Sequence, residues 1–349
     1  MSKVPLDQTG GEGSTNLQAG RDVHLHGLTM AEARQVALDV FTANALELRG
    51  LAQAVAVSRA EEITNDFLDK LSITNPKSAE SLAEPDMQSV LFEAQKEYAR
   101  SGEEDLKEAL IDLLATRAGQ TDRDLRTLAL NEAILSAPKL TEQQRRAVAW
   151  VFFLRYTRDV GSGTPEMFYT RFEEVVVALG TNVPNRHADY QHMEYVGVGT
   201  ISISSVSFGA ATCSGSEGLF TNGFPETTVE GELLARLQGA NLVVPCIRNP
   251  ENIQLNLIAE EELPDRLKGA GLESDLEMVR PLMSIGRMSE DEIATEAVSH
   301  VPALKPLVEM WDSDATGFRN LTLTSVGLAL GHAYWARLTG RKAPLSIWL

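Results

Sequence analysis

The segment from Gly27 to Leu71 constrains the fold more than any other part of the chain. It contains no proline, has one internal glycine, Gly50, and consists mostly of alanine, leucine, valine, glutamate and arginine. Most of these residue types favour helices. Thr29 and Glu32 have the spacing of a capping box, in which each side chain bonds to a backbone N–H of the first turn. The pattern predicts one long helix over residues 28–71, on the order of 65 Å in length.

An almost uncharged stretch lies in the middle of this predicted helix. Between Val40 and Ser58 the only charged residues are Glu47 and Arg49. A solvated helix carries more charge, so we expect other protein to cover this stretch. The cover is either the core of the same chain or a second copy of it, and the two alternatives overlap. The residues expected to contact a second copy are Val23, Leu25, Phe41, Leu48, Leu51 and Val55.

The residues before the helix are expected to form a leader and one short strand. Residues 1–15 are polar and glycine-rich, which is typical of disorder. Residues 16–27 alternate between apolar and polar positions, as a strand does, and such a strand needs a partner. His24 and His26 lie on its polar side, close enough to share a metal ion. No third ligand is nearby, so two exposed strand histidines are the favoured interpretation.

Helical patterns continue to about residue 185 and predict a helical domain over residues 28–185. The segment Thr141-Glu-Gln-Gln144 is a capping box. The helix that follows has so few polar positions that we expect it at the centre of the core. Thr164 followed by Pro165 is a second helix start, and that helix is expected to end near Gly180.

Residues 186–349 predict an α+β domain with C-terminal helices. Gly209–Gly223 is expected to be a loop of small residues, and Thr227–Glu230 to be a capping box. No repeat at a spacing of 20 to 50 residues is apparent. One small sheet is expected within about residues 196–258, from the segments Val196–Phe208, Leu242–Ile247 and Asn252–Ile258. The fold class is therefore mainly α, a multi-helix domain with one long N-terminal helix and a small inserted sheet, α+β overall.

The last motif combines an extended segment with a helix. Leu321 and Leu323 alternate with threonine, and Thr324 is positioned to cap the helix that follows. Gly327 and Gly331 would allow another helix to approach this one closely.

Composition argues against nucleic acid and membrane surfaces as partners. The formal charge is −18, from 49 acidic and 31 basic residues, and phosphate backbones would be repelled by that average field. A local basic face would need Arg145, Arg146, Arg155 and Arg158. Two cysteines make no disulfide framework, and no apolar run is long enough to cross a bilayer. The N-terminus is not a signal peptide, so a cytoplasmic protein is expected.

No strong catalytic or cofactor-binding pattern is present. Cys213, in the predicted loop, could pair with His187 or His192 as a nucleophile and its base, but no nucleophile signature surrounds it. The segment Gly161-Ser-Gly-Thr164 could hold an anion at a helix N-terminus, although a plain loop and cap is the favoured interpretation. The segment Gly197-Val-Gly199 is no dinucleotide fingerprint. We expect no cofactor.

Two acidic runs allow a cation site as an alternative. Glu260–Glu262 and Ser289–Glu292 could attract a divalent cation. Such runs are more often solvated faces or first turns of helices, where negative charge is favourable.

The two ends of the chain resemble a family of uncharacterised bacterial proteins. The resemblance rests on Gln18-Ala-Gly-Arg-Asp22-Val, on Gly27-Leu-Thr with the helix pattern through Asn44, on Arg59–Leu68 and on Leu323–Gly331. These segments cover about a fifth of the chain. The resemblance implies a short strand after a disordered leader and then a long helix. It implies no catalytic residues, and similar leaders accompany bacterial conflict and antiphage proteins.

The resulting hypothesis is a non-enzymatic, self-associating sensor or adaptor that binds another macromolecule, in bacterial antiphage defence. The alternative is an enzyme of unfamiliar type centred on residues 209–223 with Cys213.

Overall fold

The chain is mainly α-helical, as predicted. The computed structural model describes residues 30–44, 51–159 and 161–349. The α-helices are α1 (Met30–Asn44), α2 (Leu51–Thr74), α3 (Pro85–Ser101), α4 (Glu104–Ala118), α5 (Leu125–Ser136), α6 (Glu142–Tyr156), α7 (Pro165–Leu179), α8 (His187–Val196), α9 (Phe208–Cys213), α10 (Gly231–Gly239), α11 (Leu263–Gly269), α12 (Leu276–Val279), α13 (Glu290–His300), α14 (Lys305–Asp312) and α15 (Ser325–Thr339). The strands are β1 (Gly199–Ile201), β2 (Val243–Pro245), β3 (Ile253–Leu255) and β4 (Leu321–Leu323).

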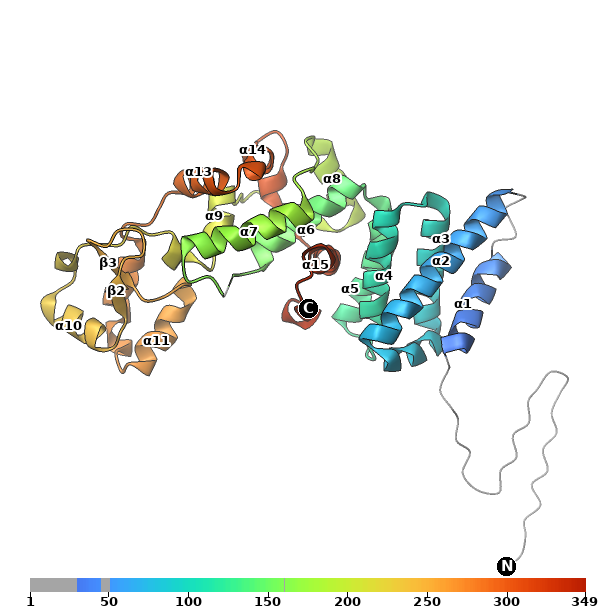
Figure 1. Ribbon diagram of the computed structural model, residues 1–349, viewed down its shortest axis with the longest axis horizontal. Coiled ribbons are helices and arrows are strands. Elements are labelled where there is room, and N and C mark those ends of the chain that lie inside the picture. Colours follow the sequence, from blue (N-terminus) through green and yellow to red (C-terminus); the bar gives the residue numbers. More distant parts are fainter. Residues whose placement is uncertain (1–29, 45–50, 160) are drawn as a thin grey trace, which may run out of the picture.

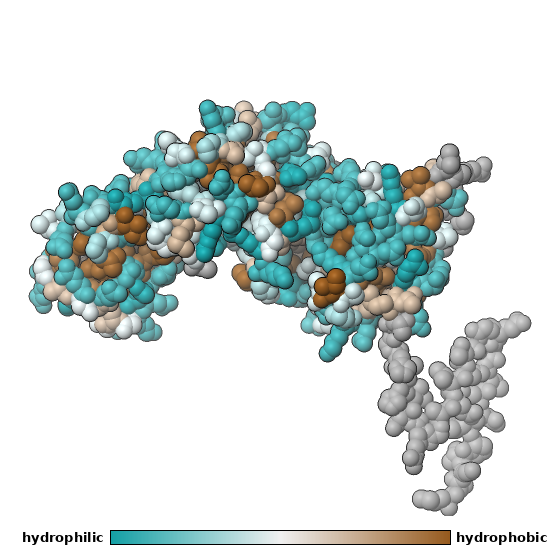
Figure 2. Space-filling model, in the orientation of Figure 1, coloured by the Kyte–Doolittle hydropathy of each residue, from teal (hydrophilic) through white to brown (hydrophobic). Residues whose placement is uncertain are grey.

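The molecule is elongated (Figure 1). Helices α1 to α5 lie at one end, α6, α7 and α15 lie in the middle, and a lobe with β2, β3, α10 and α11 lies at the other end. Figure 2 shows a largely hydrophilic face on which hydrophobic residues gather in several patches, including one over the lobe. Exposed apolar side chains of the lobe include Met278 and Ile247.

The predicted single helix over residues 28–71 is wrong. Helix α1 ends at Asn44 and α2 begins at Leu51, and the two helices pack side by side. Arg34 Nε donates to Asn65 Oδ1 at 2.9 Å, whereas one straight helix would separate residues 31 positions apart by roughly 46 Å. The hairpin forms because it buries apolar residues of both helices against each other and against α3, which a single rod could not do.

This pairing covers only part of the uncharged stretch between Val40 and Ser58. Phe41 is 5% exposed and belongs to a small apolar cluster with Ala56 and Ala60. Ala52, Ala54 and Val55 are exposed, and residues 45–50 lie outside the described residues. Self-association therefore stays a prediction.

One hydrophobic core runs from α1 to the C-terminal residues, so it does not divide at residue 185. Helix α6 lies at its centre as predicted, with every residue from Ala147 to Phe152 fully buried. Helix α15 packs closely on α6 at Gly331, as predicted, whereas Gly327 approaches Val198, which lies between α8 and β1. A Cβ at Gly327 would lie 1.8 Å from the carbonyl oxygen of Val198, and one at Gly331 would lie 2.7 Å from Cβ of Phe152.

Several predicted helix starts are confirmed. Thr141 and Gln144 form the capping box of α6. The hydroxyl groups of Thr164 and Thr324 accept from backbone N–H groups in the first turns of α7 and α15, and Ser289 opens α13 in the same way. The predicted box at Thr227–Glu230 is wrong, because α10 begins at Gly231 with no side-chain cap.

The predicted small sheet is two separate ribbons. Strand β1 pairs with β4 in antiparallel register, and β2 pairs with β3. The predicted strand Val196–Phe208 stops at Ile201, and the predicted loop from Gly209 begins as helix α9. Helix α9 forms because the Ser207 hydroxyl accepts from the backbone N–H of Ala210 at 3.0 Å.

The lobe has its own hydrophobic core, separate from that of the helical body. Its buried residues come from β2, β3, α10, α11, α12 and the segments between them. They are Phe224, Val229, Leu233, Leu237, Leu242, Val243, Ile253, Leu255, Leu257, Leu263, Leu267, Val279 and Leu282. The lobe, residues 224–285, is inserted between α9 and α13.

Candidate functional site

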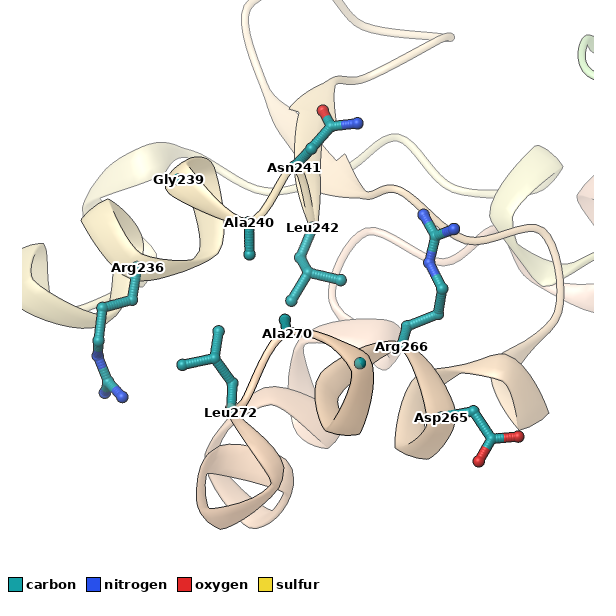
Figure 3. Close-up of a pocket in the computed structure, with 10 residues that line it drawn as sticks. Arg236, Gly239, Ala240, Asn241, Leu242, Asp265, Arg266, Ala270 and Leu272 are labelled. Atoms are coloured by element: carbon teal, nitrogen blue, oxygen red, sulfur yellow. The ribbon is translucent and has the colours of Figure 1, made fainter.

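An open groove of about 720 Å³ lies on the lobe, between the C-terminal ends of α10 and α11 (Figure 3). Ala240 and Leu242 line one wall, and Ala270 and Leu272 line the other. In Figure 3 the side chains of the two walls point toward one another, and the two arginines of the groove, Arg236 and Arg266, lie on opposite sides.

The two walls are copies of one sequence motif. Leu233-Leu-Ala-Arg-Leu-Gln-Gly-Ala-Asn-Leu242 and Leu263-Pro-Asp-Arg-Leu-Lys-Gly-Ala-Gly-Leu272 share leucine, arginine, leucine, glycine, alanine and leucine at the same six positions. The copies begin thirty residues apart, at 233 and 263. The expectation of no repeat at a spacing of 20 to 50 residues is therefore wrong here, and the signal was present in the sequence.

The copies also share their backbone geometry. The N–H of Leu242 donates to the carbonyl of Leu237 at 2.9 Å, and that of Leu272 donates to the carbonyl of Leu267 at 2.9 Å. Each of these bonds joins residues five positions apart, as in the Schellman motif that ends many helices. In that motif the residue just before the donor adopts the left-handed conformation, with positive φ. Asn241 and Gly271 are those residues, with φ of 54° and 70°. Each helix therefore stops at the groove and turns its chain along the wall.

The polar groups of the groove are held in place by neighbours. Arg236 makes two hydrogen bonds to the carboxylate of Asp275, at 2.5 and 3.1 Å. Arg266 donates to the carbonyl oxygen of Asn256 at 3.0 Å. The floor between them is apolar, so the groove combines a hydrophobic strip with an arginine at each side. Arg236 is paired with Asp275, and the carboxylate Asp265 also lines the groove.

Two glycines leave the groove open. A Cβ at Gly239 or Gly269 would meet no heavy atom within 4 Å. Both residues line the groove. A side chain added at either position would therefore occupy the groove without disturbing the lobe's core.

The predicted Cys213 site lies elsewhere and has a different polar neighbour. Cys213 is in α9, is 4% exposed, and lies 3.8 Å from Nη2 of Arg287. Burial raises the pKa of the Cys213 thiol and outweighs Arg287, which lowers it. Nucleophilic attack needs the thiolate, so this environment disfavours it.

The histidines proposed to pair with Cys213 make other contacts. His187 Nδ1 is 3.1 Å from the carbonyl oxygen of Thr316, and His192 contacts the side chain of Gln144. The structure therefore gives Cys213 an arginine rather than a histidine as its polar neighbour.

The predicted anion loop holds a carboxylate of the same chain. The backbone N–H of Gly161 donates to Asp159 Oδ1 at 2.9 Å, and the Ser162 hydroxyl donates to the same carboxylate. Arg171 completes the set at 2.9 Å. Burial raises the pKa of Asp159, but these partners outweigh it and leave the pKa below its usual value. Asp159 therefore occupies the position that an external anion would take.

The alternative basic face does not form. Arg145 is fully buried, and it donates to Tyr334 Oη and to the carbonyl oxygen of Leu140, both at 2.5 Å. Arg146 and Arg155 donate to backbone carbonyl groups. These arginines hold the helical body together instead of presenting charge to a nucleic acid.

The remaining predicted residues divide into two groups. One group lies outside the described residues, together with the predicted leader and strand. It consists of the predicted metal ligands His24 and His26, the predicted contact residues Val23, Leu25 and Leu48, and the side chain of Leu51. Val55 is 49% exposed.

The acidic runs hold no candidate metal site. Ser289 and Glu292 form a capping box, and Glu260–Glu262 forms a turn of 3-10 helix. Within residues 30–44, 51–159 and 161–349, no group of His, Cys, Asp and Glu side chains could hold a metal ion.

The fold and these sites define a mainly α-helical protein with two small β ribbons and a separately packed lobe. In the described part of the chain, no helix has both the length and the apolar content that crossing a bilayer requires. The chain belongs to a protein family whose model matches residues 27–349 and whose description, ":-like", names no activity. No curated protein and no solved structure matches the chain. Membership of an uncharacterised family agrees with the resemblance seen at the two ends of the sequence.

Proposed function

We propose that the protein is a non-enzymatic sensor or adaptor whose lobe binds another protein through the groove between the duplicated motifs. The proposal is based on the open groove. It lies on a unit with its own hydrophobic core, at one end of an elongated molecule (Figure 1).

The chemistry of the groove favours a particular kind of segment. An apolar side chain of the partner would contact Leu242, Ala270 and Leu272, and burial of such anchors supplies most of the energy of small interfaces. A carboxylate of the partner would meet Arg266, whose guanidinium prefers carboxylates. The proposed ligand is therefore an apolar segment with an acidic residue next to it.

The open glycines provide the test. Gly239→Gln and Gly269→Gln would each fill the groove, and glycine replacement in a helix does not itself destabilise it. Gly231→Gln is the matched control, because Gly231 is equally open but does not line the groove. We expect chemical crosslinking in cells to yield the same partner with wild type and with Gly231→Gln, and to lose it with the two groove variants.

Equal crosslinking of all four proteins would contradict the proposal. Loss of the partner with Gly231→Gln as well would also contradict it, because the effect would then not belong to the groove.

The cellular role that we propose is antiphage defence in a bacterial cytoplasm. Its support is the resemblance of the N-terminal segment to leaders of conflict proteins. A phage challenge of cells that carry the wild type, the groove variants or Cys213→Ser tests it. We expect protection to be lost with the groove variants and kept with Cys213→Ser, whereas the reverse pattern favours the enzyme alternative.

Self-association belongs to the same proposal and has its own measurement. Light scattering at micromolar concentration should give a mass above the 38.1 kDa of one chain. A strictly monomeric mass removes self-association and leaves groove binding standing.

A further inference from the structure

A second cavity, of about 460 Å³, lies in the helical body among α6, α7, α15 and the C-terminal segment. Its size is within the usual range for small-molecule sites, about 300–1,000 Å³. It is separate from the lobe groove, and its lining differs from the rest of the chain in two respects, aromatic content and charge.

The walls of the cavity are aromatic. The lining includes six aromatic side chains: Phe153, Tyr156, Phe168, Phe172, Trp335 and Trp348. Only 6% of the chain is aromatic, so this is a strong local concentration. The rings are held in place from behind. Trp348 donates its Nε1–H to the carbonyl oxygen of Tyr156 at 2.6 Å, and Phe153 lies 5.3 Å from Phe172 between ring centroids. Rigid aromatic faces of this kind stack well on a planar ring.

The charge of the lining is opposite to that of the whole protein. Three arginines, Arg158, Arg171 and Arg341, line the cavity with one carboxylate, Asp159. The chain as a whole has a net charge of −18. Guanidinium groups recognise phosphate and carboxylate groups through paired hydrogen bonds.

Arg341 and Arg158 are ordered but weakly paired, whereas Arg171 uses one donor, Nη1, for Asp159. Arg171 binds Asp159 at 2.9 Å, and Arg341 Nη2 donates to the carbonyl oxygen of Arg171 at 3.2 Å. Arg341 also faces Glu174 at 3.5 Å, and Arg158 faces Glu261 at 3.0 Å. Both glutamates are more than half exposed, so these two ion pairs are weak and exchangeable.

A neighbouring hollow extends the cationic surface. It has a volume of about 500 Å³ and shares Arg341 and Ala343 with the aromatic cavity. Lys70, Arg337 and Lys342 line it together with Asp112. Lys70 and Arg337 are paired with Asp112 and Asp105, so Lys342 is the cation of this hollow that could add to Arg341.

One buried donor at the cavity has no partner. Trp335 lines the cavity and is 6% exposed, and its indole Nε1 is buried without a hydrogen-bond partner. This N–H is shielded from solvent, so a ligand in the open cavity would reach it only after the Trp335 side chain moves.

We propose that this cavity binds a mononucleotide, with the base among the aromatic rings and the phosphate at Arg171 and Arg341. A purely apolar ligand would use the aromatic rings alone and a simple anion would use the arginines alone, whereas a nucleotide uses both. This binding does not depend on the groove proposed to bind a protein.

Tryptophan fluorescence provides a direct measurement. Trp335 and Trp348 line the cavity, whereas Trp150 and Trp311 are fully buried elsewhere in the core. The probes are the four ribonucleoside monophosphates. Two incomplete ligands serve as controls: adenosine, which lacks the phosphate, and ribose 5-phosphate, which lacks the base. We expect at least one monophosphate to change the fluorescence and to bind at least about tenfold more tightly than either incomplete ligand. Trp348→Phe should reduce the fluorescence change.

Arginine variants locate the phosphate. Arg171→Gln and Arg341→Gln are each expected to weaken binding by about tenfold or more. Arg186→Gln is the matched control, because Arg186 is exposed on the surface and pairs only with Asp189. Circular dichroism checks folding, and Arg341→Gln keeps the test valid if Arg171→Gln fails to fold.

Several results would overturn the proposal. One is no binding of any monophosphate at about 1 mM. Others are ribose 5-phosphate or adenosine binding as tightly as the nucleotide, and Arg186→Gln weakening binding as much as the cavity variants do.

Discussion

The helical body and the lobe are stabilised in different ways. In the body, charged side chains from distant helices are buried together. Asp105 of α4 accepts from Tyr334 at 2.7 Å and from Arg337 at 2.9 Å, and Arg145 of α6 lies 3.2 Å from the same carboxylate. The lobe combines an apolar core with a charged pair from within the lobe, Arg236 with the buried Asp275, and two of its short helices end in the same capping motif.

Glycines show the same difference. In the body a Cβ at Gly327 would collide with a backbone carbonyl, whereas in the lobe a Cβ at Gly239 would meet open space. In the body, small residues let α15 come close to other segments of the chain. The lobe uses them to leave a surface free. The body therefore depends on contacts between distant segments, whereas the groove of the lobe has room for added side chains.

The largest effect is expected from the buried charges of the body. Asp105→Ala leaves Arg145 buried with less compensating charge, which should cost about 3–5 kcal/mol of the free energy of unfolding. Urea denaturation measures it. Asp105→Asn keeps a hydrogen-bond acceptor and should cost less. Equal losses for the two variants would mean that charge is not the cause.

Asp105 should also make the stability of the body depend on pH. Burial raises the pKa of Asp105, but hydrogen bonds from Tyr334 and Arg337 and the nearby guanidinium charges outweigh it and lower the pKa. An aspartate in the unfolded chain has a pKa of about 3.9. Because the pKa of Asp105 is lower in the folded state, its carboxylate stabilises the folded state at pH values above about 3.9, and this stabilisation is lost as the pH falls toward the pKa of the folded state. The stability difference between wild type and Asp105→Ala should therefore shrink below about pH 4.

The next largest effect should destabilise the lobe and leave the helical body unchanged. Leu237 and Leu267 are fully buried at equivalent positions of the duplicated motif. Leu237→Ala and Leu267→Ala should each cost about 3 kcal/mol, within the usual range for buried leucines. Because the lobe core is separate, we expect hydrogen exchange to accelerate in residues 224–285 and to stay slow in α6 and α15. Equal acceleration in α6 would show that the two cores unfold together.

A smaller loss is expected where α15 meets the chain at Val198. Gly327→Ala places a methyl group 1.8 Å from that carbonyl oxygen, so the helix must shift. Overpacking of this kind costs about 1–3 kcal/mol. The measurement is the midpoint of thermal unfolding, and an unchanged midpoint would contradict the close contact.

The smallest effect is expected in the lobe. Gly239→Ala adds a methyl group in open space and reduces the freedom of the unfolded chain, which should raise stability by about 0.5 kcal/mol. The same thermal measurement compares it with Gly327→Ala. A loss similar to that of Gly327→Ala would remove the contrast between body and lobe.

Much of the secondary structure could be predicted from the sequence, and most of the candidate sites could not. The cap at Thr141 and the segment from Leu321 through Thr324 are present as expected. The groove has a sequence signal, the repeated motif at 233 and 263, which is short and easily overlooked. The aromatic cavity has none, because its lining comes from α6, α7, α15 and the C-terminal segment, and only folding brings these together.

Local sequence is enough to predict where several helices begin, because a helix cap is an interaction between residues about three positions apart. Thr164 and Ser289 needed no distant partner to start their helices. The partners of the arginines and the pairing of α1 with α2 depend on how the whole chain packs. Arg145 meets Tyr334 across 189 residues, and Arg34 meets Asn65 through a hairpin. Such contacts depend on how helices pack, and packing is set by the whole core rather than by any local pattern.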